Sequence, residues 1–87
     1  MVEKTIKIIN SSGLHARPAA LFVQTANKYT SEIWIKYGTK KVNAKSIMGL
    51  MSLAISKGSA IIIGAEGEDE EIAIKELEDL IISGLGE

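Results

Sequence analysis

Residues 32–44 read EIWIKYGTKKVNA, and this stretch predicts a β-hairpin. Residues 32–37 are rich in β-branched and aromatic side chains, which favour strands. Gly38 and Thr39 form a tight-turn signal, after which residues 40–44 return as a second strand. A hairpin pairs its strands antiparallel, so we expect an antiparallel sheet that extends outward from this segment.

Two strands and a helix are predicted around the hairpin. Residues 5–9 alternate polar and apolar side chains, so Ile6 and Ile8 are expected to face inward, and residues 59–65 form a strongly apolar strand. Residues 16–29 predict a helix because apolar side chains recur at helical spacing, at Ala19, Phe22, Val23 and Ala26.

Two more helices follow the hairpin. Ser46 is expected to cap a short helix over residues 47–53, which ends before Gly58. Asp69 is expected to cap the last helix, which stops near Gly84 and whose inward face is assigned to Ile72, Ala73, Leu77, Leu80 and Ile81. The order β-α-β-β-α-β-α predicts an α+β fold, a two-layer sandwich with all three helices on one face of a four-stranded antiparallel sheet.

The composition indicates a single globular domain over residues 1–87. With 46% hydrophobic and 24% charged residues, the chain is not of the disordered class. The longest apolar run, residues 60–63, is far shorter than the roughly 18 residues of a membrane helix, so no membrane insertion is expected. The first residues lack a secretory-signal pattern, and the absence of cysteine fits a reducing cytoplasm.

The net charge of −1 hides an asymmetry along the chain. Residues 1–65 carry a net charge of +7, whereas residues 66–87 carry −8. If the fold keeps these halves apart, it presents a basic face that favours anionic partners.

The only histidine, arginine and proline of the sequence lie together, as His15, Arg17 and Pro18. Proline suits the first helical turn, so His15 is expected at or just before a helix start. There the backbone N–H groups of Ala16 and Arg17 form an anion site, to which the guanidinium adds a forked cation. The same positive field favours a neutral imidazole that can attack a phosphoryl group. The pattern predicts a phosphohistidine, against the simpler interpretation of a surface histidine without function.

Other chemistry is less favoured by the sequence. A single histidine without cysteine does not make an ordinary zinc site, so neither a metal nor a cofactor is expected. Ser46 is explained by helix capping alone, although a phosphate on its oxygen would also sit well there beside Lys45. Met48 and Met51 lie in a helix too short to bury all its apolar residues, so an exposed adaptable patch and a fully buried core remain alternatives.

Two motifs resemble those of a known family. Residues 13–19, GLHARPA, are similar to the active-site signature of HPr, the histidine-containing phosphocarriers of the bacterial phosphoenolpyruvate:sugar phosphotransferase system. Residues 45–53, KSIMGLMSL, resemble the regulatory serine signature of HPr proteins of Gram-positive type. The likeness extends over essentially the whole chain. It implies the HPr open-faced β-sandwich with sheet order 1-4-2-3.

The resemblance also implies a function. His15 would be phosphorylated on Nδ1 by Enzyme I at the expense of phosphoenolpyruvate, would pass the group to an EIIA domain of a sugar permease, and would be assisted by Arg17. Ser46 would be phosphorylated by HPr kinase/phosphorylase with ATP, and that form would bind the repressor CcpA. The docking surface would comprise Ala20, Gln24 and Asn27 with Ile47, Met48 and Met51. Such a carrier is not an independent enzyme, and a cytoplasmic monomer is expected.

Alternatives of other classes can be compared with this one. The paralogue Crh resembles HPr but lacks the active-site histidine, so His15 argues against it, and the serine region separates the chain from the nitrogen-branch homologue. A regulatory module that works only through Ser46 and the methionine patch remains a second hypothesis. A nucleic-acid binder is disfavoured, because the aromatic residues form no RNA-binding motif and the isoelectric point is about 5.8.

Overall fold

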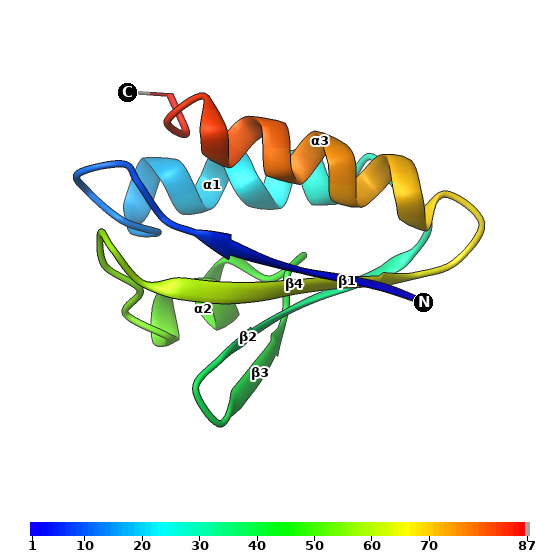
Figure 1. Ribbon diagram of the computed structural model, residues 1–87, viewed down its shortest axis with the longest axis horizontal. Coiled ribbons are helices and arrows are strands. Elements are labelled where there is room, and N and C mark those ends of the chain that lie inside the picture. The colour runs from blue at the N-terminus through cyan, green and yellow to red at the C-terminus, as the bar shows by residue number, and fades with distance from the viewer. Residues whose placement is uncertain (87) are drawn as a thin grey trace.

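The computed structural model describes residues 1–86 and has the element order β-α-β-β-α-β-α (Figure 1). The strands are β1 (Val2–Lys7), β2 (Glu32–Tyr37), β3 (Lys40–Asn43) and β4 (Ala60–Glu66). The helices are α1 (Ala16–Ala26), α2 (Ile47–Ser52) and α3 (Glu70–Ile82). The predicted succession of elements is therefore confirmed.

The four strands form one open antiparallel sheet in the order β1-β4-β2-β3. The hairpin joins β2 to β3, pairing Trp34 with Asn43 and Tyr37 with Lys40. Gly38 has a φ of 62°, a left-handed conformation that suits glycine in such a turn. Both the antiparallel sheet and the strand order implied by the family resemblance are confirmed.

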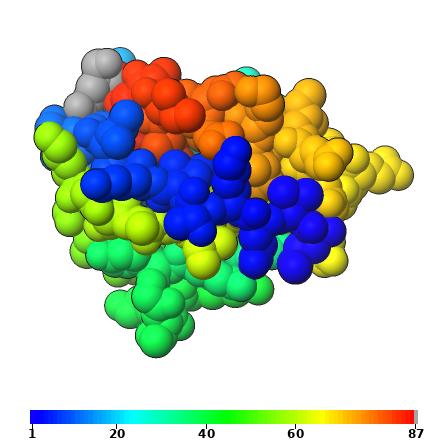
Figure 2. All heavy atoms as spheres, in the orientation of Figure 1, coloured from blue at the N-terminus to red at the C-terminus, as the bar shows by residue number. Residues whose placement is uncertain are grey.

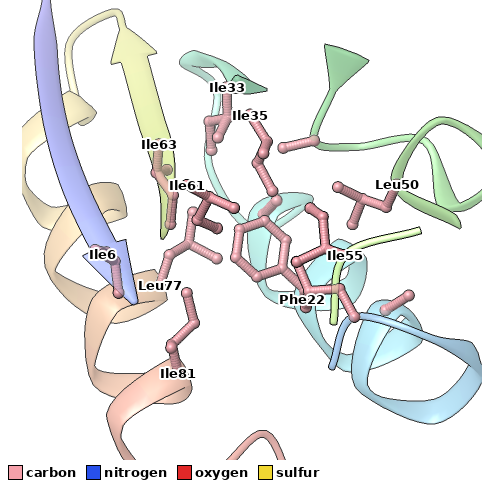
Figure 3. Close-up of a cluster of buried hydrophobic side chains, with 14 of the residues drawn as sticks. Ile6, Phe22, Ile33, Ile35, Leu50, Ile55, Ile61, Ile63, Leu77 and Ile81 are labelled. Atoms are coloured by element: carbon pink, nitrogen blue, oxygen red, sulfur yellow. The ribbon is translucent and has the colours of Figure 1, made fainter. Parts of the chain in front are cut away.

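The hydrophobic core lies between the sheet and the helices. Helices α1 and α3 run in opposite directions over one face of the sheet, while α2 packs against α1 and β3 (Figure 1). Phe22 of α1 points into the middle of the core, among side chains from the sheet, α2 and α3 (Figure 3). Full burial of an isoleucine, leucine or phenylalanine contributes about 1.5–3 kcal/mol each, so this cluster provides the main stabilisation.

Within residues 1–86, no helix covers the opposite face of the sheet (Figure 1). There the ring of Trp34 lies flat on Gly64 of β4, so closely that any side chain at position 64 would collide with it. The ammonium group of Lys41 lies 4.6 Å from the centroid of the indole ring, within the range of a cation–π interaction. Trp34 is therefore largely buried, although it is not part of the core cluster between the sheet and the helices.

Two predicted boundaries are wrong by several residues. β1 begins at Val2 and ends before Ile8, whose backbone instead bonds to Gly58 and Ser59. The first helix ends at Ala26 rather than near Tyr29, because the chain continues in tight turns closed by i→i+3 hydrogen bonds. Ile8 and Ile9 continue the apolar pattern past the end of β1, and Tyr29 is the one apolar residue after α1 that lies near helical spacing. The pattern alone therefore places both ends too far along the chain.

The last helix also departs from its prediction in two respects. Ile72 was assigned to the inward face but is 61% exposed, and Ile74 is buried in its place. The buried stripe of α3 follows Ala73, Ile74, Leu77 and Ile81, which turns the neighbouring Ile72 toward solvent. Asp69 does not cap α3 with its side chain, which instead binds Thr30 and Ser31.

The two oppositely charged parts of the chain are interleaved in space. The N-terminal ammonium group pairs with Glu70 at 3.0 Å, Lys4 with Glu78 at 2.8 Å and Lys28 with Glu76 at 2.7 Å. Much of the acidic surface of α3 is thereby neutralised by basic groups from residues 1–65. Among residues 1–86 there is no helix long and apolar enough to cross a membrane.

Candidate functional site

His15 lies at the N-terminal end of α1. It is the N-cap residue, with extended backbone angles (φ −108°, ψ 159°), and its side chain makes no capping hydrogen bond. Its carbonyl oxygen accepts the first helical hydrogen bond, from the N–H of Ala19 at 3.3 Å. The imidazole is exposed, so a partner protein can reach it.

The residues after His15 combine exposure with local strain. Ala16 and Arg17 are exposed, whereas Pro18 is buried in the first turn of the helix. Ala16 has a φ of 36°, a left-handed conformation that costs a residue with a side chain about 1–2 kcal/mol. Such strain persists only where the surrounding structure holds it in place.

The first turn of α1 has the chemistry of an anion site. No backbone carbonyl of residues 1–86 accepts a hydrogen bond from the N–H of Ala16 or Arg17. The side chain of Arg17 makes no ion pair within the same part of the chain. Free N–H groups, the positive end of the helix dipole and a guanidinium together favour a phosphoryl group beside His15.

Ser46 lies at the start of α2 and caps it. Its Oγ accepts a hydrogen bond from the N–H of Gly49 at 3.1 Å, which confirms the predicted capping role. The neighbouring Lys45 is turned away from Ser46, because its Nζ donates to the carbonyl oxygen of Tyr29 at 2.6 Å. The serine is half-buried.

Helix α2 carries an exposed apolar surface beside α1. Met48 is 81% exposed, Met51 44% and Ile47 39%, whereas Leu50 is fully buried. The prediction that part of this helix stays exposed is therefore confirmed. We call these three exposed residues the α2 patch.

The α1 residues predicted to belong to the docking surface follow one helical stripe. Arg17, Ala20, Gln24 and Asn27 are spaced by three or four residues and so lie on one side of the helix. Gln24 and Asn27 are exposed and Ala20 is half-buried. Since α1 packs against α2, this stripe and the α2 patch lie on neighbouring elements.

A hollow in the surface lies away from His15 and Ser46. It is on the uncovered face of the sheet and is lined in part by Trp34, Lys36, Lys41 and Lys45. None of the residues predicted to bind or carry a phosphoryl group lines it. Among residues 1–86, no cluster of histidine, cysteine or acidic side chains is arranged to hold a metal ion.

Two perturbed acid–base groups, Asp69 and Tyr29, also lie away from His15, at the start of α3 and in the loop after α1 (Figure 1). Hydrogen bonds from Ser31 and Thr30 lower the pKa of Asp69 to about 2. A hydrogen bond to Glu76 raises the pKa of Tyr29 to about 12. These groups tie loops together and take no part in the candidate anion site.

The chain is similar to known proteins over nearly its full length. The family described as "PTS HPr component phosphorylation site" matches residues 2–83. The HPr-like protein Crh of Halalkalibacterium halodurans is 61% identical over 77 residues, which cover 88% of this chain and 92% of that protein. The phosphocarrier protein HPr of Neisseria meningitidis serogroup A is 47% identical over 87 residues, which cover 100% of this chain and 98% of that protein.

Solved structures agree with this likeness. The crystal structure of HPr-C-His from Thermoanaerobacter tengcongensis has a TM-score of 0.97 and 63% identity, and the match covers 100% of this chain and 98% of that one. A crystal structure of Bacillus subtilis Crh, described as a swapped dimer, has a TM-score of 0.77 and 49% identity, with 97% of each chain covered.

Proposed function

Because the chain belongs to the HPr family of phosphotransferase-system phosphocarriers, we propose that Nδ1 of His15 is the atom that carries the phosphoryl group. Enzyme I would donate the group at the expense of phosphoenolpyruvate, and an EIIA domain of a sugar permease would accept it. The observation that carries the proposal is the exposed imidazole of His15 at the start of α1, which makes no capping hydrogen bond.

The transfer is a substitution at phosphorus. The lone pair of Nδ1 attacks the phosphoryl group, an N–P bond forms, and the bond from phosphorus to the group on Enzyme I breaks. The second transfer reverses these roles toward EIIA. Arg17 and the N–H groups of Ala16 and Arg17 stabilise the phosphoryl oxygens, and Pro18 supports the first turn of the helix whose dipole assists them.

Reversible transfer needs a phosphoryl group that is held weakly. The proposed stabilisers are exposed and screened by solvent, so each contributes modestly. This suits a carrier that exchanges the group between partners and is not an independent enzyme. It also suits a protein that acts in the cytoplasm, where both partners meet it.

Partners would dock on the α2 patch and on the stripe formed by Ala20, Gln24 and Asn27. Exposed methionines adapt their shape to different surfaces, which helps one small patch serve Enzyme I and EIIA in turn. Met48→Lys is expected to weaken docking and raise KM while leaving stability nearly unchanged, because the side chain is 81% exposed.

Ser46 is proposed as the regulatory site. HPr kinase/phosphorylase would phosphorylate it with ATP, which adds about −1.5 to −2 charges beside the docking surface. This charge would slow transfer through His15 and create the form that binds CcpA as corepressor. We expect no large change of fold, so amide NMR shifts of Ser46→Asp should change only near α2; changes throughout the domain would contradict this.

A monomer is proposed as the functional form, since the site must stay open to two partners. The swapped dimer described for Bacillus subtilis Crh makes the oligomeric state an open test. Light scattering at micromolar concentration is expected to give the mass of one chain, and a stable dimer would refute this part of the proposal.

The carrier function is tested by labelling. Incubation with Enzyme I and phosphoenolpyruvate is expected to add one acid-labile, alkali-stable phosphoryl group, which mass mapping places on His15. His15→Ala should abolish the label, whereas Ser46→Ala, the control, should keep it. No labelling of the wild type beside a labelled control HPr would refute the proposal.

The similarity to Crh favours a second candidate, a regulatory module that works only through Ser46. It predicts labelling of Ser46 by the kinase and no consequence of His15→Ala. The experiment above separates the two candidates.

A further inference from the structure

The peptide unit between Gly13 and Leu14, just before His15, is held by hydrogen bonds at both its carbonyl and its N–H group. The carbonyl oxygen of Gly13 accepts a hydrogen bond from Nδ2 of Asn10 at 2.6 Å. The N–H of Leu14 donates to the carbonyl oxygen of Ile55 at 3.0 Å. Both groups belong to the same planar peptide, so together they fix its orientation. We call this arrangement the Gly13–Leu14 clamp.

The clamp joins two segments that are distant in sequence. Residues near 10 and residues near 56 lie side by side at one end of the molecule (Figure 2), where Ile8 also bonds to Gly58 and Ser59. Gly13 has a φ of 63°, and a Cβ at this position would collide with the carbonyl oxygen of Ile55. The turn is closed a second time by the N–H of Gly13, which donates to the carbonyl of Asn10 at 3.2 Å.

The burial of Asn10 is costly. The residue is only 3% exposed, and its Oδ1 has no hydrogen-bond partner in the described part of the chain. A buried acceptor without a partner lowers stability. An asparagine at this position is therefore explained by its donor, the Nδ2 that fixes the carbonyl of Gly13.

In the chain, His15 lies between the Gly13–Leu14 clamp and helix α1. On its C-terminal side Ala16 adopts the left-handed φ of 36°, and Ala19 binds the carbonyl of His15. On its N-terminal side only Leu14 separates His15 from Gly13. If the clamped peptide rotates, the strained backbone at Ala16 can relax, and the imidazole moves with it.

We propose that Asn10 is a positioning residue, whose amide fixes the Gly13–Leu14 peptide and thereby sets the direction in which the imidazole of His15 faces a phosphoryl donor. This rests on the proposed phosphoryl transfer at His15. A displacement of about 1 Å can slow a reaction by up to about 100-fold. The proposed docking surface is the α2 patch with the stripe formed by Ala20, Gln24 and Asn27, which does not include the clamp. Loss of the clamp therefore acts on the transfer rate more than on partner affinity.

The test uses Asn10→Ala in the full chain. In NMR spectra of the variant, the three-bond HN–Hα coupling at Ala16 and the chemical shifts of the His15 ring should differ from those of the wild type. With Enzyme I and phosphoenolpyruvate, kcat should fall about tenfold or more with little change in KM. Ile63→Val removes one methylene from a fully buried position in β4 and serves as the stability control, with wild-type couplings and kcat expected.

A second variant covers the case in which Asn10→Ala does not fold. Asn10→Asp keeps the shape of the side chain but removes the donor at neutral pH, and burial raises the pKa of the introduced carboxyl. Mild acid should then restore a donor and return the Ala16 coupling toward the wild-type value.

The positioning role would be overturned if Asn10→Ala kept the wild-type couplings and the wild-type kcat. It would also be overturned if the coupling at Ala16 in Asn10→Asp did not depend on pH. A wild type that Enzyme I does not label would refute the proposed function instead. In that case the couplings alone still decide whether the clamp orients His15.

Discussion

The two ends of helix α1 are held in different ways. At the C-terminal end, side chains fix the loop of residues 27–31: Asp69 binds Thr30 and Ser31, and Glu76 binds Lys28 and Tyr29. Lys45 adds a hydrogen bond to the backbone of the same loop. The charged side chains at this end of α1 therefore take part in contacts that hold the loop.

At the N-terminal end, it is the backbone before His15 that is held, in part by the side-chain amide of Asn10. The Gly13–Leu14 clamp fixes the chain, whereas the imidazole of His15 makes no capping bond and the guanidinium of Arg17 makes no ion pair within residues 1–86. One end of α1 thus uses Asp69, Glu76 and Lys45 to hold a loop, whereas the other leaves the side chains of His15 and Arg17 available for a ligand.

The strongest destabilisation is predicted for a variant that disrupts the Gly13–Leu14 clamp at the N-terminal end of α1. Gly13→Ala places a Cβ against the carbonyl of Ile55 and demands a left-handed backbone from alanine. The free energy of unfolding should fall by about 2–4 kcal/mol, measured by urea denaturation. Gly38→Ala is the control, because its φ of 62° is similar but nothing lies within 4 Å of a Cβ there. Equal losses in both variants would show that the clamp adds nothing.

The next effect comes from the opposite end, with Asp69→Asn. The carboxylate accepts hydrogen bonds from Ser31 and Thr30, which hold its pKa near 2, below the ordinary value of 3.8. Since the folded pKa is lowered, this stabilisation is present above pH 3.8 and is lost as the pH falls toward about 2. Asp69→Asn should lower Tm by several degrees at neutral pH and reduce the further loss in acid.

Asp79→Asn provides the control for that measurement. Asp79 lies in α3 and, within residues 1–86, its side chain pairs with Lys75 at 3.3 Å in solvent. Its Tm should stay close to that of the wild type, since exposed pairs of this kind contribute little. If Asp69→Asn lost stability in acid as the wild type does, the proposed role of Asp69 in stabilising the loop of residues 27–31 would be contradicted.

A smaller effect at the same end is expected from Tyr29→Phe. The hydrogen bond to Glu76 raises the pKa of Tyr29 from 10.0 to about 12. The folded pKa is raised, so the stabilisation is present below pH 10 and is lost as the pH rises toward 12. Urea titrations between these pH values should show less loss of stability in Tyr29→Phe than in the wild type. A loss in Tyr29→Phe as large as that in the wild type would contradict this role of the hydrogen bond to Glu76.

The smallest effect has the opposite sign. Ala16→Gly removes a strained left-handed alanine beside His15, although glycine loses more chain entropy on folding. The free energy of unfolding should rise by up to about 1 kcal/mol, seen as a later midpoint in urea. Ala54→Gly, at a φ of 51°, tests whether such relief is general or confined to the segment after His15. A clear loss of stability in Ala16→Gly would contradict the presence of strain.

Local patterns were enough to predict much of the fold. The hairpin at residues 32–44 and the order of the elements follow from alternation, turn residues and helical spacing. The strand order came from the family resemblance, because single-sequence patterns do not tell which strands pair. Ile72 was misplaced because one turn of α3 offers isoleucines at both 72 and 74, and only packing against the sheet selects between them.

The candidate site was predicted in part. His15 and its neighbours are unusual residue types in one short segment, which sequence reasoning finds readily. Asn10 was missed because its role depends on a carbonyl three residues away and on Ile55, which only the tertiary structure brings close. Asp69 is the N-cap residue of α3, as predicted, but its side-chain partners were missed for the same reason, since Thr30 and Ser31 are 39 and 38 residues distant.

The stacking of Trp34 between Gly64 and Lys41 has a practical consequence. It is the only tryptophan of the chain, so intrinsic fluorescence comes mainly from a single fluorophore on the uncovered side of the sheet. Its emission should redden when β2 and β4 separate and water reaches the indole. The protein thus carries its own optical reporter of denaturation, in which no dye is needed and the region around His15 is left unlabelled.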